Sequence, residues 1–202
     1  YKLSGSYATE VSDASGTIPM DIAKRNWSPA ILGGLKINRD FLPDVFESAD
    51  ITARVCASAA GLTGLVEGTP IVGGAGDQAG GAVGSGIVKP GLLSASLGTS
   101  GVVFSYSDTP AYDAQGRLHS FCHAVTGKWH LMGVTLSAAG SFKWYEDNFG
   151  PSEKIRQEHP DKKKYKLHDL QAEKVKPGSD GLIFLPYLTG ERTTYADPYA
   201  RG

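Results

Sequence analysis

The sequence is poor in cysteine. Its 202 residues include only Cys56 and Cys122, which lie far apart and in unlike surroundings. Two such residues provide neither a disulfide framework nor a C-x-x-C metal or redox motif. A reducing compartment suits a chain of this kind, and we therefore expect a cytoplasmic protein.

The sequence also lacks an excess of charge of one sign. Lys and Arg number 20 and Asp and Glu number 21, so the formal net charge is −1. Without a basic field the chain does not suit nucleic acid or an anionic membrane surface, and the lysine run at 162–164 is short enough to be a solvated loop. No apolar run approaches the length of a membrane span, and the first residues lack a signal-peptide pattern. We expect neither a nucleic-acid nor a membrane partner.

An initiator methionine is missing as well. The chain runs from Tyr1 to Gly202, and we interpret it as a piece of a longer protein. Its composition, 41% hydrophobic and 20% charged, is typical of a globular chain. A chain of this length can bury a sizeable core in one large or two small domains.

Local signals in the first half predict helices and strands in alternation. Ser28 as a cap and Pro29 at the first helical position start a helix that continues through Leu35. Residues 69–72 are expected to form a buried strand whose C-terminal end leads to Asp77, followed by a helix over residues 78–86. Ligands of open α/β sheets gather at that end of the strands.

After Gly91 the pattern changes to hairpins, and we place a domain boundary near Lys89-Pro90. The expected elements are hairpin strands at 92–97 and 102–106 and at 120–125 and 129–134, a helix at 136–149, a charged loop at 151–164, a helix at 167–175 and a strand at 181–186.

Two glycine-rich turns contain the residues that suit phosphoryl transfer. The first precedes Asp77, a lone acidic residue, and the second is Gly98-Thr99-Ser100-Gly101. Glycines let backbone N–H groups approach an anion, and the two hydroxyls suit phosphate oxygens. Phosphoryl transfer needs positioning, charge neutralisation and one carboxylate that orients or deprotonates the attacking hydroxyl. These turns supply two of the three.

Each of these features also has a purely structural interpretation. Asp77 before Gln78 is a normal helix N-cap, and the second turn is also what a simple hairpin requires. His119, His123 and His130 suggest a metal, but no cysteine or carboxylate completes a ligand set, so packed or surface histidines are favoured. Glu191 and Arg192 are candidates for a ligand contact. Their purely structural interpretation is an ion pair that braces a loop.

Five blocks of the sequence together resemble the FGGY family of carbohydrate kinases, and within it the xylulokinases. Each block alone is weak, but the five stand in the family's order and spacing over nearly the whole chain. The blocks are LSGSYAT at 3–9, GGAGD at 73–77, LGTSG at 97–101, HSFCHA at 119–124 and LPYLTGER at 185–192. One departure is Thr194, where relatives usually have proline; threonine there is expected only to loosen the loop.

The resemblance implies an α/β actin-like ATPase fold of ribonuclease H type, with portions of two domains. Residues 1–89 would be the C-terminal part of the N-terminal FGGY domain, and residues 90–202 the N-terminal part of the C-terminal domain. Family members bind sugar and ATP between these domains. Their phosphate hairpin with its Mg²⁺-associated aspartate, a sugar-contacting loop and the adenosine site are not found in this sequence, so we expect the piece alone to be inactive.

The resemblance also assigns the site residues. Asp77 matches the catalytic base, which also contacts the substrate hydroxyl. The nucleotide contacts fall on small residues of two segments: Gly98, Thr99, Ser100, Gly140 and Ser141. The implied cofactors are ATP and Mg²⁺, and no residue of this chain is assigned to the metal.

The implied reaction is transfer of the γ-phosphate of ATP to a ketopentose, D-xylulose at its 5-hydroxyl. Two alternatives stay open: a related kinase for gluconate, ribulose or glycerol, and a non-catalytic actin-like module that binds sugar or nucleotide. Asp77 favours catalysis because a pure binder needs no base there. The expected partner is a small-molecule sugar, and a homodimer is compatible with the resemblance.

Overall fold

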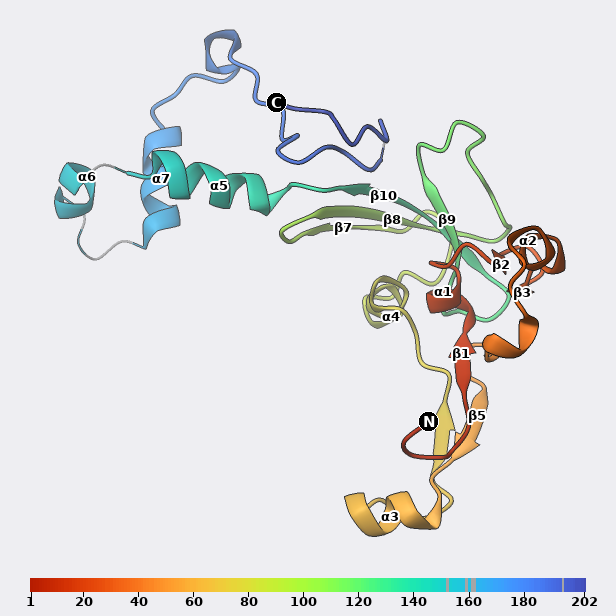
Figure 1. Cartoon of the computed structure of the whole chain (residues 1–202). Helices are drawn as coiled ribbons and strands as arrows, with labels where there is room; N and C mark the ends of the chain where they lie inside the picture. Colours follow the sequence, from red (N-terminus) through yellow and green to blue (C-terminus); the bar gives the residue numbers. More distant parts are fainter. Residues whose placement is uncertain (152, 159, 161–162, 194) are drawn as a thin grey trace. The chain divides into compact units, whose positions relative to one another are not determined.

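The computed structural model describes residues 1–151, 153–158, 160, 163–193 and 195–202. The departure noted at Thr194 and one lysine of the 162–164 run lie outside the described residues. The chain forms two compact units, one of residues 1–94 and 103–133 and one of residues 95–102 and 134–202. Figure 1 traces the elements along the chain.

The first unit contains short strands and helices. In chain order they are β1 (Ala8–Glu10), α1 (Val11–Ala14), β2 (Met20–Asp21), β3 (Asn26–Trp27), α2 (Pro29–Leu35), a 3-10 helix (Arg39–Phe41), β4 (Asp44–Phe46), β5 (Ile51–Arg54), α3 (Ala57–Thr63), β6 (Pro70–Val72) and α4 (Asp77–Gly84). Strand β1 pairs with β4 in parallel, and β2 with β3 and β5 with β6 pair antiparallel. The chain is therefore a mixed α/β structure.

A four-stranded sheet follows, with the order β7-β8-β10-β9. Its strands are β7 (Leu93–Leu97), β8 (Gly101–Ser107), β9 (His119–Cys122) and β10 (Trp129–Thr135). Strands β9 and β10 pair antiparallel, with Trp129 opposite Cys122 and Met132 opposite His119. Both predicted hairpins are confirmed, because their strands are neighbours in this sheet.

The predicted helix after Ser28 is also confirmed. The Ser28 side chain accepts a hydrogen bond from the Ile31 N–H, Pro29 begins α2, and Lys36 ends it in the left-handed conformation. By contrast, β6 was expected to be buried, yet Pro70 and Val72 are exposed and Ile71 is half-buried. The expectation of a buried strand is wrong because β6 is part of a two-stranded sheet.

The core of the first unit consists of two clusters of buried side chains. One contains Val11, Ala14, Met20, Trp27, Leu32 and Cys122, and the other contains Ala82, Ile87, Phe104 and Tyr106. A hydrogen bond from the Cys122 N–H to the Ser15 hydroxyl, at 3.0 Å, ties β9 to the end of α1. The hairpin and the N-terminal segment thus share one core.

Two histidines are packed inside this unit. His123 is fully buried and His130 is 2% exposed, and the Phe104 ring contacts both, stacked on His130 at 4.2 Å between centroids. The His123 Nδ1 accepts the Val125 N–H, so its Nε2 carries the proton and donates to the Ile87 carbonyl at 3.1 Å. The interpretation as packed histidines is confirmed for this pair. Burial lowers the pKa of both, that of His130 to about 3.

We expect this histidine pair to make the fold acid-sensitive. Below pH about 6.5 the two histidines become protonated in the unfolded chain. In the folded chain they stay neutral until the pH reaches their lower pKa values, so the free energy of unfolding falls as the pH falls. The expected slope is up to about 1.4 kcal/mol per pH unit for each histidine. Urea unfolding at pH 7.5 and 5.5 measures it, with His130→Phe as the comparison. An equally steep slope in that variant would contradict the assignment.

The second unit is mainly helical, with α5 (Ala139–Phe149), α6 (Glu153–Glu158), α7 (Lys164–Ala172) and a 3-10 helix (Ser179–Gly181). The predicted helix that ends at Gly150 is confirmed. The loop predicted at 151–164 is wrong, because α6 forms there from residues of good helix propensity. The strand predicted at 181–186 is wrong too, since Leu182 and Ile183 are 81% and 80% exposed and no described strand pairs with them.

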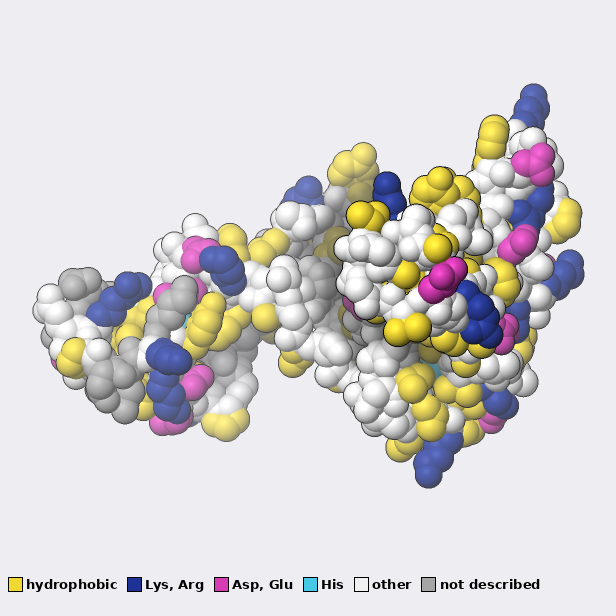
Figure 2. All heavy atoms as spheres, turned by 90° about the horizontal axis from the view of Figure 1, so that it is seen from below, with side chains coloured by type: hydrophobic (Ala, Val, Ile, Leu, Met, Phe, Trp, Pro, Cys, Tyr) yellow, Lys and Arg dark blue, Asp and Glu magenta, His cyan; other side chains and the backbone are white. Residues whose placement is uncertain are grey.

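The surface combines apolar and charged side chains. Figure 2 shows apolar side chains at many places on one face, with both signs of charge interspersed. Large exposed apolar residues occur along the chain, among them Phe41, Leu62 and Tyr112. Among the described residues, none of the helices combines the length and apolar character that crossing a membrane requires.

Candidate active site

Asp77 is the first residue of α4, directly after the glycine-rich turn that leaves β6. Its side chain is exposed, and its Oδ1 accepts a hydrogen bond from the Gln78 N–H at 2.7 Å. The N-cap position is held by Gly76, so Asp77 is not the cap. A carboxylate in the first helical turn is favoured by the helix dipole and remains accessible.

Asp77 borders two cavities of the first unit. One of about 460 Å³ is also lined by Ala8, Thr9, Glu10, Asp13, Gly73, Ala75 and Gly76. The lining of the other, of about 140 Å³, includes Phe121, His130 and Met132. The larger volume is in the range of small-molecule sites. Asp13 lines both cavities with Asp77, which its sequence context did not indicate.

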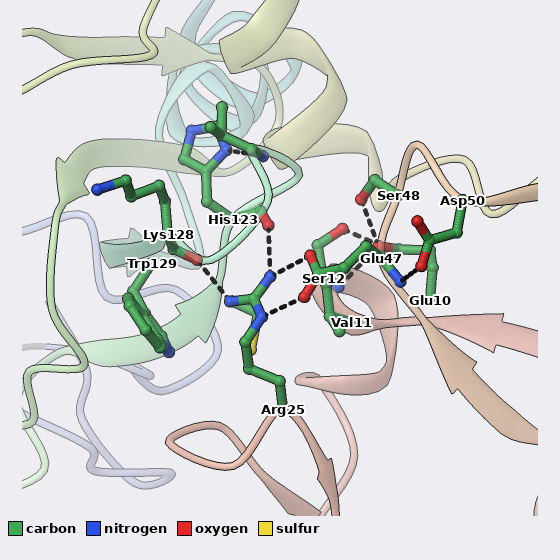
Figure 3. A network of polar contacts seen from close by, with 12 residues as sticks. Glu10, Val11, Ser12, Arg25, Glu47, Ser48, Asp50, His123, Lys128 and Trp129 are labelled. Carbon is green, nitrogen blue, oxygen red and sulfur yellow. Dashed lines mark hydrogen bonds and ion pairs between the residues drawn. The ribbon is translucent and has the colours of Figure 1, made fainter.

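Glu10 also lines the larger cavity, and sequence reasoning did not single it out. Its side chain is 3% exposed, and its carboxylate accepts hydrogen bonds from the N–H groups of Ser12, Asp13 and Gly76. The hydroxyls of Ser12 and Ser48 donate to it as well, both at 2.7 Å (Figure 3). An acidic residue just before a short helix is a capping signal, but the contact with Gly76 has no local signal.

A second carboxylate, Glu47, is held close by. The Arg25 guanidinium pairs with it through two hydrogen bonds of 2.6 Å and donates to the Lys128 carbonyl at 2.8 Å (Figure 3). The chain can pass this point only as glycine, since a Cβ at Gly73 would lie 2.8 Å from the Glu47 carbonyl oxygen and 3.0 Å from the Glu10 Cβ. The turn that leads to Asp77 is therefore tightly packed at its start.

The second turn belongs to the other unit, between β7 and β8. Thr99 is exposed, and the Ser100 hydroxyl donates to the Leu136 carbonyl at 3.1 Å. The carbonyls of Gly98 and Thr99 accept the N–H groups of residues 138–140 at 2.9 to 3.1 Å. The N-terminal N–H groups of α5, which would otherwise lack helical partners, thus bind the turn.

Gly140 and Ser141 stand where α5 begins. A Cβ at Gly140 would lie 2.9 Å from the Thr99 carbonyl oxygen and 3.1 Å from the Thr99 Cγ2, so only glycine allows this approach. The Ser141 side chain is buried, and its hydroxyl donates to the Ala138 carbonyl at 2.7 Å. Gly140 therefore lets α5 approach the turn closely, while Ser141 stabilises the first turn of α5.

Glu191 supports the same region. Its Oε2 accepts the Thr135 hydroxyl at 2.6 Å, and its Oε1 accepts the N–H groups of Leu136 and Arg192 at 3.0 and 2.7 Å. Burial alone would raise the pKa of this carboxyl, but the hydrogen bonds outweigh burial and lower it. The Glu191 carboxylate braces the loop through backbone and hydroxyl donors, and the bond from Arg192 comes from its backbone N–H and not from the expected ion pair.

The predicted site residues are divided between the two units. Asp77 belongs to the first unit, whereas Gly98, Thr99, Ser100, Gly140 and Ser141 belong to the second, where the structure brings them together. The N–H groups of Gly98 and Gly140 and the hydroxyls of Ser100 and Ser141 already donate to carbonyls within this unit. Among the predicted residues, the exposed Thr99 side chain offers the hydroxyl that fits a phosphate oxygen. Within the described part of the chain, no group of three or more His, Cys, Asp or Glu gathers as a metal site requires.

Two family models match the chain, one after the other. The N-terminal domain of the FGGY family of carbohydrate kinases matches residues 1–84, and the C-terminal domain of the same family matches residues 93–202. The chain belongs to the FGGY family. The resemblance inferred from the five sequence blocks is thereby confirmed.

Curated FGGY relatives align with the chain from end to end. It is 37% identical to the xylulose kinase of Bacillus subtilis over 202 residues, covering 100% of this chain and 38% of the relative. It is 40% identical to the xylulose kinase of Lactococcus lactis, covering 99% and 38%, and 32% identical to a gluconokinase of Bacillus subtilis. The chain thus spans about two fifths of the length of the relatives it matches.

Solved FGGY structures superpose on the chain over almost its full length. A xylulose kinase from Brucella ovis gives a TM-score of 0.82 at 36% identity, covering 98% of this chain and 39% of that one. A xylulose kinase and a gluconate kinase from Lactobacillus acidophilus give 0.84 and 0.85 at 25% identity, each covering 99% and 39%. The predicted actin-like ATPase fold, present as a portion, is confirmed.

Proposed function

We propose that the protein containing this chain is an ATP-dependent kinase that phosphorylates a ketopentose, D-xylulose at its 5-hydroxyl. The observation that carries the proposal is Asp77, an exposed carboxylate at the start of α4 that borders a cavity of about 460 Å³. The xylulose kinases at 37–40% identity support this sugar over gluconate, for which the relative named above is 32% identical.

In the proposed reaction Asp77 is the general base and a contact to the substrate. Its carboxylate orients the sugar hydroxyl and accepts the proton as that oxygen attacks phosphorus. Because a loose phosphoryl-transfer transition state gains mainly from alignment, the fixed start of α4 matters as much as basicity. The accessible position of the side chain supports this role.

We assign the nucleotide side of the site to the second unit. Gly98, Thr99 and Ser100 form the proposed phosphate turn, and Gly140 and Ser141 belong to the same site because they stand at the start of α5, whose first N–H groups bind that turn. Bound MgATP supplies the phosphoryl group and the neutralising charge; none of the residues in this chain is assigned to the metal. The exposed Thr99 hydroxyl is the donor that reaches a phosphate oxygen.

The remaining parts of the proposal concern the whole protein. We propose a domain boundary at Lys89-Pro90, which lies between the two matched ranges. The protein is proposed to work in the cytoplasm on a small-molecule sugar, with a homodimer as an option. Gluconate is the alternative substrate, and it is supported by the solved gluconate kinase that superposes on this chain. A non-catalytic binding module is disfavoured, since binding alone does not require a carboxylate such as Asp77.

A coupled ADP-release assay on the full-length protein tests this function. We expect the largest kcat/KM with D-xylulose in a panel that also contains gluconate, ribulose and glycerol. The 202-residue chain by itself is expected to show no turnover, because it spans only 38–39% of the relatives' length. A larger kcat/KM with gluconate would replace the substrate, and no turnover of the full-length protein with any sugar would reject the kinase proposal.

Gly140→Ala tests whether α5 positions the phosphate turn. The added Cβ meets the Thr99 backbone, which cannot give way as a flexible side chain could. We expect a stability loss of about 1–3 kcal/mol and weaker ATP binding with unchanged sugar binding. Gly81→Ala is the matched control: its Cβ meets nothing within 4 Å on α4, so a gain of about 0.5–1 kcal/mol is expected. Unchanged ATP affinity in folded Gly140→Ala would contradict the positioning role.

A further inference from the structure

We propose that Glu10 is a positioning residue for the reaction, acting through Gly76 on Asp77. The proposal rests on the function assigned to Asp77 above. Gly76 is the N-cap of α4 and immediately precedes Asp77, and its N–H donates to the Glu10 Oε1 at 3.2 Å. Glu10 itself is almost completely buried, so its effect on the reacting groups is indirect.

The hydrogen bonds of Glu10 join three segments that are distant in sequence. Oε1 accepts the Asp13 N–H, the Ser12 hydroxyl and the Gly76 N–H, and Oε2 accepts the Ser12 N–H and the Ser48 hydroxyl. The start of α1, the residue following Glu47 and the cap of α4 are therefore tied to one carboxylate. Figure 3 shows Ser12 and Ser48 beside Glu10.

The Gly76 N–H has two acceptors, the Glu10 carboxylate and the Ser12 hydroxyl. The Gly76 N–H also reaches the Ser12 hydroxyl oxygen at 3.0 Å, and that hydroxyl donates to the Glu10 Oε1 at 2.7 Å. A Cβ at Gly76 would lie 3.7 Å from the Asp13 backbone, so the two chain segments pass within van der Waals contact. The cap of α4 is thus held by a triangle of hydrogen bonds one peptide unit before Asp77.

The choice of glutamate goes beyond what capping α1 requires. A serine or asparagine satisfies the N–H groups of a short helix, whereas the longer side chain also reaches Ser48 and Gly76. All five contacts are donors to the carboxylate, so an amide nitrogen in place of one oxygen would face donors and leave them unsatisfied. Glu10→Gln keeps the shape and removes this match.

The effect of Glu10 on the rate follows from how well it keeps the Asp77 carboxylate aligned with the sugar hydroxyl. A misplacement of about 1 Å costs a catalytic group about 10²-fold in rate. We therefore expect Glu10→Gln in the full-length kinase to lower kcat about 10–100-fold per folded molecule, with the KM for D-xylulose and the Kd for ATP nearly unchanged.

A double-mutant cycle with Asp77→Asn separates positioning from other effects. If Glu10 acts only through Asp77, the double variant is no slower than Asp77→Asn alone. Rate losses that multiply would overturn the proposal. Glu47→Gln is the matched control, because it makes the same chemical change in a carboxylate that pairs with Arg25 and does not bind Gly76. Its kcat per folded molecule is expected to stay at the wild-type level.

Folding is measured separately by urea unfolding of each variant. Should Glu10→Gln fail to fold, Glu10→Asp retains the charge but withdraws it by one methylene, and a smaller loss of kcat is expected. Wild-type kcat in the folded variant, beside a slow Asp77→Asn, would overturn the positioning role alone. Wild-type kcat in Asp77→Asn would instead overturn the proposed base, and the positioning role with it.

Discussion

Asp77→Ala in the full-length protein is expected to lower kcat of the proposed reaction by about 10²–10⁴-fold, the contribution of a positioned general base. The carboxylate is exposed at the first turn of α4 and borders the larger cavity, so removing it deletes the proton acceptor without opening the core. ATP affinity should change much less, because the proposed nucleotide contacts lie in the other unit. Steady-state kinetics with D-xylulose and isothermal titration with ATP measure the two effects.

A purely structural role predicts a different result. Loss of a favourable carboxylate in a first helical turn costs about 0.3–1 kcal/mol of stability and leaves kcat per folded molecule intact. Asp44→Ala is a suitable control, since Asp44 is an exposed carboxylate paired with Arg39 and lines neither cavity. Near-normal kcat in folded Asp77→Ala would remove Asp77 from the catalytic role.

Thr99→Val is expected to weaken ATP binding, or to raise the transition-state barrier, by about 1.5–3 kcal/mol, which is ten-fold or more. Valine keeps the shape of threonine and deletes the hydroxyl. The Gly98 and Thr99 carbonyls that bind the start of α5 are backbone groups, so the turn itself should persist. The Kd for sugar without nucleotide should be nearly unchanged, because the Thr99 hydroxyl is proposed to contact only phosphate.

Separate titrations with ATP and with sugar distinguish the two interpretations of this turn. A hairpin residue that only faces water contributes little, and its replacement would leave both ligands unaffected. If Thr99→Val left ATP affinity and kcat intact, or weakened sugar binding instead, the turn at 98–101 would not be the phosphate loop.

Local signals predicted most elements correctly. Ser28 and Pro29 located α2, and the hairpin predicted from residues 120–125 and 129–134 corresponds to β9 and β10. The strand expected at 181–186 failed because a short apolar run forms a strand only where a neighbouring strand pairs with it. The loop expected at 151–164 failed because high charge was weighted above helix propensity.

The candidate site was predictable only in part. Asp77 and Thr99 stand in glycine-rich turns whose composition carries a local meaning, and the order of five sequence blocks indicated the family. Glu10 could not be found in this way. Its contacts with Ser48 and Gly76 span 38 and 66 residues, and nothing near Glu10 in the sequence indicates either partner.

The sequence by itself therefore determined the family, the mixed α/β class and the two glycine turns, because propensity, turn chemistry and motif order are local properties of the chain. Tertiary structure alone decided that Gly76 caps α4 while Asp77 stays exposed, that the start of α5 binds the turn at 98–101, and that one buried carboxylate joins three segments. These arrangements depend on donors and acceptors that only folding brings within hydrogen-bond distance.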